Sequence, residues 1–268
     1  MAERSATLHF VLGVLTVAVG LGLWKLFSPA PPGPRPAAPE PPAAAAPAPE
    51  PAVRHPLPGE PPEAAMQAPA TPPPEARAAF DGELPQVAPA EAIARFAGAG
   101  DLIRRIVSTV DNLASDSLPI AVRAVAPIPG RFAVRGPEGA RELDVEANAA
   151  RYEPFVRFAE SIDARRAAQL YVRHYRLFQG ELRGQGSPDR YFNDRVVASI
   201  DHLLATPVVD GPIRLVQPRV QYRFEDPALE SLSAGQKAMI RIGPKNAARL
   251  KAVLRSMRAE LARSQPGG

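Results

Sequence analysis

The stretch from Tyr191 to Leu204 carries the side chains most able to do chemistry. It reads YFNDRVVASIDHLL and holds two aspartates, an arginine and one of the four histidines of the chain. Paired carboxylates can bind a metal ion or act as the acid and base of a glycosidase. On a helix, however, the seven positions between Asp194 and Asp201 correspond to an axial rise of about 10.5 Å, too far for both to reach one ion. We therefore expect a polar helix face, or caps to a neighbouring loop.

Other sequence signals of catalysis are also absent. The chain has no cysteine, which excludes disulfides, thiolate metal sites and cysteine nucleophiles. It has no His-Glu-x-x-His, Gly-x-Ser-x-Gly or phosphate-loop motif. His174 lies beside an apolar helix face and is expected to be a core or boundary residue. We therefore assign no catalytic, metal-binding or cofactor-binding residue. An enzyme would have to gather acids from distant segments, for example Asp111, Asp194 and Glu225.

The elements that position these residues belong to a C-terminal domain expected over residues 80–264. Its predicted class is α+β, predominantly α-helical, with one or two short hairpins or strands. The pattern predicts a helix over 101–113 capped by Asp101, a hairpin of 131–134 with 140–143, and helical structure from Pro154. A further helix is expected after Asp163, with Tyr171, Tyr175, Phe178 and Leu182 on one face. Next come a helix opened by Ser187 and Pro188 that contains Tyr191–Leu204, a strand up to Phe224, and a last helix over 244–262.

Two basic surfaces are candidates for binding a partner. In the predicted strand, apolar Val220, Tyr222 and Phe224 alternate with polar residues, which should place the polar residues on one side. The last helix carries six cations opposed by one glutamate, alongside an apolar stripe. The candidate partner-binding residues are Arg219, Gln221, Arg223, Lys245, Arg249, Arg255 and Arg258. The alternative for the helix is a solvated outer face with no partner.

Residues 8–27 have the composition of a transmembrane helix, and residues 1–7 form a short head before it. Twenty helical residues rise about 30 Å, the thickness of the hydrocarbon core of a bilayer. No residue between Phe10 and Trp24 is charged. A cleaved signal peptide is the alternative, but the apolar run is long and Pro31 follows the nearest cleavage site. The short head favours an inside amino terminus and a periplasmic domain. Small residues at Ala18 and Gly22 allow a weak homodimer through the span.

Residues 28–79 are expected to form a disordered tether. They contain 19 of the 33 prolines and almost no large apolar side chains. Proline prevents helix or sheet from propagating, and little apolar burial is available to offset the ordering entropy. A fully extended polyproline II chain of this length would reach on the order of 160 Å. Residues 265–268 are expected to be a disordered tail.

Several short segments of the C-terminal domain occur in a familiar combination. They are TVDNL at 109–113, PIPGRF at 127–132, YFNDR at 191–195 with IDHLLATP at 200–207, LVQP at 215–218, and YRFEDPALESLSAGQK at 222–237. From about Leu102 to Leu261 the chain resembles a bacterial family, the domain of unknown function numbered three-thousand-and-fourteen. The resemblance implies a single-span envelope protein with a variable proline-rich tether and supplies no catalytic residue. At Ala114–Ser117 the chain departs from the family, so no anionic partner is assigned to that corner.

The sequence as a whole predicts a single-pass protein of the bacterial inner membrane. Its periplasmic domain would be a non-catalytic binding or scaffold domain, with an envelope protein or a cell-wall component as partner and no cofactor. Two alternatives stay open. One is a periplasmic hydrolase of the cell-wall type that uses scattered carboxylates. The other, if the topology is inverted, is a cytoplasm-facing nucleic-acid binder, whereas no nucleic acid is expected in the periplasmic topology.

Overall fold

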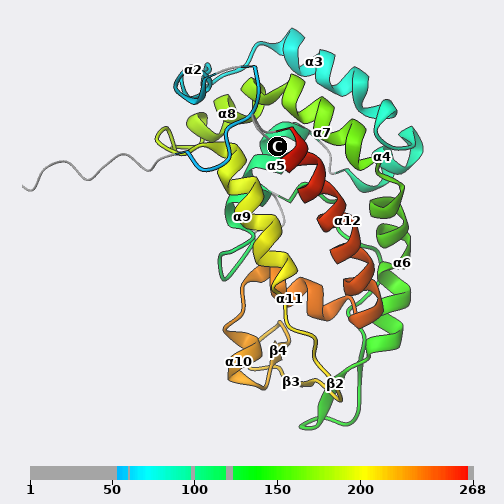
Figure 1. Cartoon of the computed structure of the whole chain (residues 1–268). Helices are drawn as coiled ribbons and strands as arrows, with labels where there is room; N and C mark the ends of the chain where they lie inside the picture. The colour runs from blue at the N-terminus through cyan, green and yellow to red at the C-terminus, as the bar shows by residue number, and fades with distance from the viewer. Residues whose placement is uncertain (1–52, 60, 98–99, 119–122, 265–268) are drawn as a thin grey trace, which may run out of the picture. The chain divides into compact units, whose positions relative to one another are not determined.

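Helices make up most of the folded chain, and a small antiparallel sheet lies at one end of it (Figure 1). The computed structural model describes residues 53–59, 61–97, 100–118 and 123–264. The predicted head, the predicted span at 8–27, the first part of the predicted tether and the predicted tail lie outside these residues. Among the helices that are described, none combines the length and apolar character needed to cross a bilayer. The prediction of a mainly helical α+β domain is confirmed.

The elements of the described residues follow one another in this order: α2 (Pro62–Met66), α3 (Pro74–Glu83), the 3-10 helix η1 (Leu84–Gln86), α4 (Ala90–Phe96), α5 (Leu102–Asn112), β1 (Val134–Arg135), β2 (Arg141–Leu143), α6 (Val145–Ser161), α7 (Ala164–Arg173), α8 (Tyr175–Gly184), α9 (Phe192–Leu204), β3 (Arg214–Val216), β4 (Arg223–Phe224), α10 (Pro227–Glu230), α11 (Ala234–Arg241) and α12 (Pro244–Arg263). Several helices begin at a side-chain cap, because a carboxylate or hydroxyl oxygen satisfies a free N–H of the first turn. Asp101, Asp163 and Ser233 cap α5, α7 and α11 in this way.

Three helix boundaries differ from the prediction. Helix α6 begins at Val145, capped by Asp144, and contains Pro154 in its interior. The helix predicted after Asp163 is two helices, α7 and α8, which meet at His174. The backbone of His174 leaves helical geometry there, at φ −103° and ψ 18°. Helix α9 begins only after Tyr191, so Ser187 and Pro188 do not open it.

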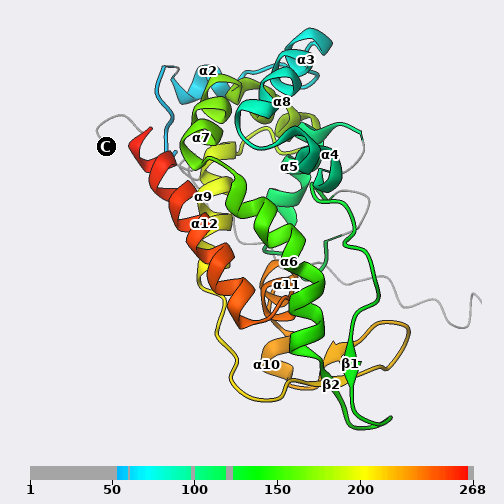
Figure 2. The same cartoon turned by 90° about the vertical axis from the view of Figure 1, so that its right-hand side faces the viewer.

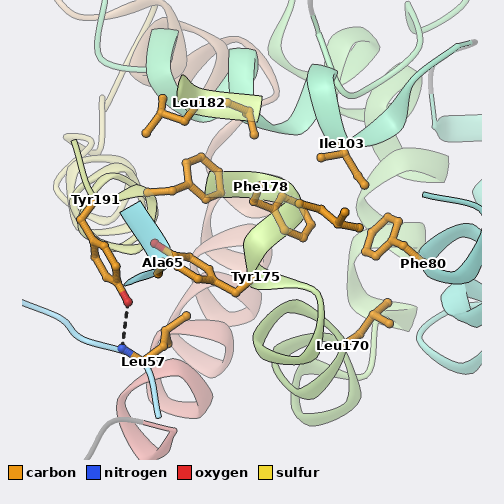
Figure 3. Close-up of a cluster of buried hydrophobic side chains, with 12 residues drawn as sticks. Leu57, Ala65, Phe80, Ile103, Leu170, Tyr175, Phe178, Leu182 and Tyr191 are labelled. Atoms are coloured by element: carbon orange, nitrogen blue, oxygen red, sulfur yellow. Dashed lines mark hydrogen bonds between the residues drawn. The ribbon is translucent and has the colours of Figure 1, made fainter. Parts of the chain in front are cut away.

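The main hydrophobic core surrounds α8, which is buried along most of its length (Figure 3). Phe178 is its centre: its ring stacks on Phe192 of α9 and meets Phe80 of α3 edge-on. Ile103 of α5 and Leu182 of α8 are buried in the same cluster. The aromatic residues predicted to share one face do meet here, although they belong to two helices.

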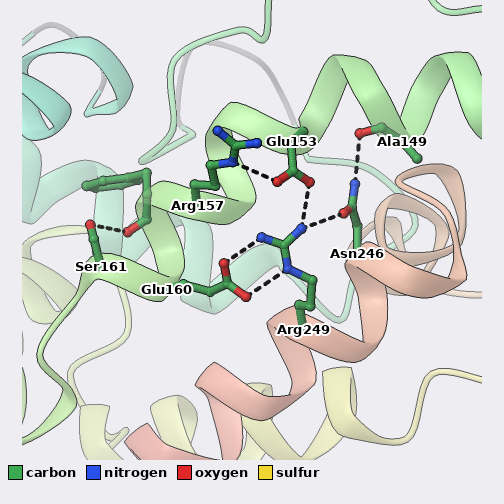
Figure 4. Close-up of polar contacts among 8 residues, drawn as sticks. Ala149, Glu153, Arg157, Glu160, Ser161, Asn246 and Arg249 are labelled. Atoms are coloured by element: carbon green, nitrogen blue, oxygen red, sulfur yellow. Dashed lines mark hydrogen bonds and ion pairs between the residues drawn. The ribbon is translucent and has the colours of Figure 1, made fainter.

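Helix α12 lies between α6 and α9 (Figures 1 and 2). Leu261 of α12 packs with Ala168 and Ile200 in a second cluster. On the other side, the guanidinium of Arg249 contacts two carboxylates of α6, Glu153 at 2.6 Å and Glu160 at 2.5 Å (Figure 4). This ion-pair network joins the long last helix to α6.

The four short strands form one sheet in the order β1-β2-β3-β4, with every pair antiparallel. The predicted hairpin is confirmed: Val134 pairs with Leu143, and a turn joins the two strands. The predicted strand ending at Phe224 is wrong in its extent, because only Arg223 and Phe224 pair, with β3. Val220 is 89% exposed, so the expected apolar side of the strand reaches only Phe224 and the half-buried Tyr222.

The prediction of a disordered tether extends too far, because the chain from Val53 to Ala79 is part of the folded unit. Leu57, Ala65 and Ala68 are buried, the first two in the main core. The prolines did not prevent folding because they occupy positions where no N–H is needed, such as the first turns of α2 and α3. The folded unit therefore includes described residues that precede residue 80.

Candidate binding groove

The first turn of α9 holds the segment before α2 by hydrogen bonds to its backbone. The Asp194 carboxylate accepts the N–H groups of Arg54 and His55, at 3.0 and 2.8 Å. The amide of Asn193 donates to the carbonyl of His55, and the hydroxyl of Tyr191 accepts the N–H of Leu57 (Figure 3). Asp194 is thus a cap for a neighbouring segment, as one of the two sequence interpretations expected.

A buried polar network fixes these side chains in place. Asn193 is fully buried. Its side-chain Oδ1 accepts from the Tyr171 hydroxyl, and its backbone N–H donates to the Tyr175 hydroxyl. Desolvation by burial raises the pKa of Tyr175, so this phenol remains protonated and donates to Gln179. The network supports the first turn of α9 from within the core.

The remaining polar residues of α9 also serve to join helices. Asp201 pairs with Arg258 of α12 at 3.3 Å. The imidazole of His202 lies 2.8 Å from the hydroxyl of Ser233, the cap of α11. Arg195 pairs with Asp111 of α5 at 2.9 Å. These contacts join α9 to α5, α11 and α12.

The acids that a hydrolase would have to gather are engaged separately. Asp111 pairs with Arg190 and Arg195, and Asp194 caps the segment at 54–55. Glu225 follows β4, at the end of the domain that holds the sheet, where it pairs weakly with Arg214 at 3.8 Å. Within the ranges that the structure describes, no group of three or more histidines or acids is placed to hold a metal ion.

The seven predicted partner-binding residues fall into three groups. Arg219, Gln221 and Arg223 are exposed on the loop between β3 and β4 and at the start of β4. Arg249 and Arg258 are bound within the domain, to α6 and α9. Among the contacts of the described chain, the side chains of Lys245 and Arg255 make no hydrogen bond or ion pair. Both side chains are exposed on α12.

Arg255 borders a groove of about 410 Å³ between α12 and the loop that joins α9 to β3. Three elements form it. The loop Thr206–Ile213 is one wall, α12 is the other, and the end of α11 with Val145 closes the floor. The lining is mainly apolar, and its buried apolar residues are Ile213, Met239 and Ile240.

The charges of the groove are predominantly positive. Lys251 and Arg255 lie on α12, and Asp210 on the loop is the one acid among the lining residues. The ammonium of Lys251 donates to the carbonyl of Thr206 at 2.5 Å, which holds the first residue of the loop against the helix. Arg255 keeps its donors available. The groove can thus receive an apolar group and, beside it, an anion.

Sequence reasoning found Arg255 but missed the loop that faces it. Val208 is 71% exposed, an unusual position for a large β-branched residue, and it follows Pro207. The local signal was the run PVVDGP, in which two valines stand between prolines and a turn-forming Asp-Gly pair. Only the tertiary fold places this run opposite α12.

The described residues form a predominantly helical α+β domain with a small antiparallel sheet. The chain belongs to the family described as protein of unknown function (DUF3014), which it matches over residues 102–258. The resemblance drawn from the short motifs is therefore confirmed. No curated protein and no solved structure is detectably similar to the chain.

Proposed function

We propose that this chain is a single-pass protein of the bacterial inner membrane whose periplasmic domain binds another envelope protein and catalyses no reaction. The observation that carries the proposal is the groove beside α12, which combines an apolar floor with the unpaired cation of Arg255. The two aspartates and the one histidine of α9, by contrast, make contacts within the domain.

The charges of the groove favour an acidic segment of a protein as its occupant. Two cations and one acid line it, so a carboxylate is attracted and a further cation is repelled. The apolar floor favours a neighbouring apolar side chain, because its burial removes hydrocarbon surface from water. A proline-rich connection to the membrane would raise the local concentration of this groove near envelope partners.

Photocrosslinking in living cells tests the proposal. A photoreactive residue replaces Val208 on the groove wall, and a matched control replaces Ala79, an exposed residue of α3 at the other end of the domain. We expect a discrete adduct with an envelope protein from position 208 and none from position 79. The substitution Arg255→Glu should lower the yield about tenfold or more, the range typical of reversing one charge of a close pair.

The matched control for charge is Lys245→Glu, on the same helix but outside the groove lining. It should leave the adduct within about twofold of the original yield, since exposed charges far from a contact contribute little. Equal losses with both variants, or identical adducts from positions 208 and 79, would contradict a groove-specific partner.

Two further measurements separate the proposal from its alternatives. Protease protection of the domain in intact spheroplasts would place it in the cytoplasm and leave nucleic acid as a candidate partner. For a hydrolase, the decisive variant is Asp194→Ala with Asp201→Ala. If the double variant folds but loses the cellular phenotype of the original chain, an enzyme is favoured. If the phenotype is lost only because the variant is unstable, a structural role of the two aspartates is supported.

A further inference from the structure

The wall of the groove formed by the loop after α9 has unused backbone hydrogen-bonding groups. The carbonyl of Thr206 accepts from Lys251, and the carbonyl of Ile213 accepts from Leu143. Between these two points, in the part of the chain that the structure describes, no backbone N–H or C=O of residues 207–212 makes a hydrogen bond to the protein. The side chains of this run are exposed except for the half-buried Val209.

Local chemistry keeps this run out of regular secondary structure. Pro207 and Pro212 cannot donate to a helix or a sheet, and the chain turns at Gly211, whose φ is +85°. Val208 and Val209, before this turn, are β-branched, a residue type that fits a strand. A run of this kind beside an apolar groove offers backbone groups without a partner, to which an extended peptide can add through hydrogen bonds.

The side chains around this run define what the added strand should carry. Successive side chains of a strand point to opposite sides, so every second one can enter the groove above Met239 and Ile240. The guanidinium of Arg255, on the opposite wall, offers paired N–H donors whose geometry matches a carboxylate. A lipid chain would fill the floor but has no backbone to pair with residues 208–210.

We propose that the partner binds by strand addition: an extended segment pairs its backbone with Val208–Asp210, places apolar side chains in the groove and sets a carboxylate on Arg255. The inference rests on the proposed function, because it names how that same groove holds its partner. The new strand pairs with this loop and not with β1 or β4, the two edges of the existing sheet.

Synthetic pentapeptides of the sequence Val-Ser-Glu-Ser-Val, in which the two valines and the glutamate lie on one face of a strand, test the backbone pairing. The fluorescent parent peptide is titrated against the full-length chain in detergent, together with a lysine counterpart and two peptides N-methylated on alternate amides. A strand added to one edge uses every second N–H, so one methylated peptide should lose binding at least about tenfold and the other should retain it. The lysine peptide should bind at least about tenfold more weakly than the parent.

Matched variants locate the contact. Arg255→Gln should weaken the glutamate peptide about tenfold, while Lys245→Gln should not change it. Since only every second N–H of the loop faces the added strand, one of Val208→Pro and Val209→Pro should weaken binding and the other should not. Val208→Ala and Val209→Ala keep the N–H and control for the side chains. A circular dichroism spectrum of each variant verifies that it remains folded.

Three outcomes would overturn strand addition: equal binding of both methylated peptides and the parent, displacement of the parent by anionic phospholipid vesicles without regard to methylation, or no saturable binding up to about 1 mM. A photoreactive residue at position 208 can still crosslink to an envelope protein in cells when one of these outcomes is found. In that case the groove remains a binding site and only the mode of binding is wrong.

Discussion

The carboxylate of Asp194 accepts a hydrogen bond from the backbone N–H of His55 at 2.8 Å, across 139 positions of sequence. The same carboxylate accepts from Arg54. This contact ties the proline-rich part of the chain to the motif YFNDR of the family domain. A motif that looks reactive thus recognises the chain's own backbone.

Replacing Asp194 by alanine should release this segment. The variant Asp194→Ala leaves two N–H groups without their acceptor, and we expect the free energy of unfolding to fall by about 1–3 kcal/mol. Amide exchange at Arg54 and His55 should accelerate more than exchange in α8. The control is Asp201→Ala on the same helix, which breaks an exposed pair with Arg258 and should cost less than about 1 kcal/mol. Equal losses in the two variants would contradict the capping role.

Truncation should locate the start of the domain. A chain that begins at residue 53 keeps Leu57 and Ala65, whereas one that begins at residue 80 lacks both and exposes the core around Phe178. The free energy of unfolding of the shorter chain should fall by at least about 2–5 kcal/mol, the loss typical of deleting one buried leucine side chain. Thermal unfolding followed by circular dichroism compares the two. Equal midpoints would mean that residues 53–79 add nothing to stability.

Replacing each of two helix glycines by alanine should change the stability of the domain in opposite directions. A Cβ on Gly180 of α8 would clash with the carbonyl oxygen of Pro69, while a Cβ on Gly82 of α3 meets nothing within 4 Å. Gly180→Ala should therefore destabilise by about 1–3 kcal/mol, because the clash outweighs the gain in helix propensity. Gly82→Ala should stabilise by about 0.5–1 kcal/mol. Urea unfolding measures both, and stabilisation by Gly180→Ala would show that the chain near Pro69 does not pack on α8.

The Arg249 network should make part of the stability depend on pH. Hydrogen bonds from Arg249 hold the pKa of Glu153 and of Glu160 below their ordinary value of 4.5. A carboxyl with a lowered pKa in the folded state stabilises the fold above its unfolded pKa, so this contribution is present above pH 4.5 and is lost as the pH falls further.

The variant Arg249→Gln should consequently be less stable than the original chain at neutral pH and lose less stability on acidification. Urea midpoints measured from about pH 7 to about pH 3 test this, with Lys245→Gln as the control that keeps the original slope. Parallel curves for Arg249→Gln and the original chain would show that the two glutamates gain nothing from Arg249.

The elements that sequence predicted well are those with a local signal. Asp101 with the apolar spacing of α5, and Gly243 with Pro244 at the start of α12, mark helix starts that depend on neighbouring residues alone. The division between α7 and α8 has no such signal, because the apolar spacing continues through His174. That residue contacts Glu83 and the ring of Phe80, so a distant part of the chain determines where α7 ends.

The same distinction applies to the groove. Arg255 could be selected from the charge bias of its helix. Only the tertiary fold distinguishes it from Arg249 and Arg258, because those two pair with carboxylates that are distant in sequence. The proline-rich segment was misjudged for a related reason. Its few apolar residues suffice because α8 and α9 supply the aromatic surface that receives them.

The early start of the domain changes how far it can travel from a membrane. In the proposed topology, the tether between the span and Val53 would have about 25 residues instead of 52. Its length when fully extended would then be about 80 Å instead of about 160 Å. Since the local concentration of a tethered group scales roughly as the −3/2 power of tether length, the groove would meet membrane-proximal targets about threefold more often. In that topology, docking of the described residues before residue 80 onto the helices would limit the volume that the groove searches.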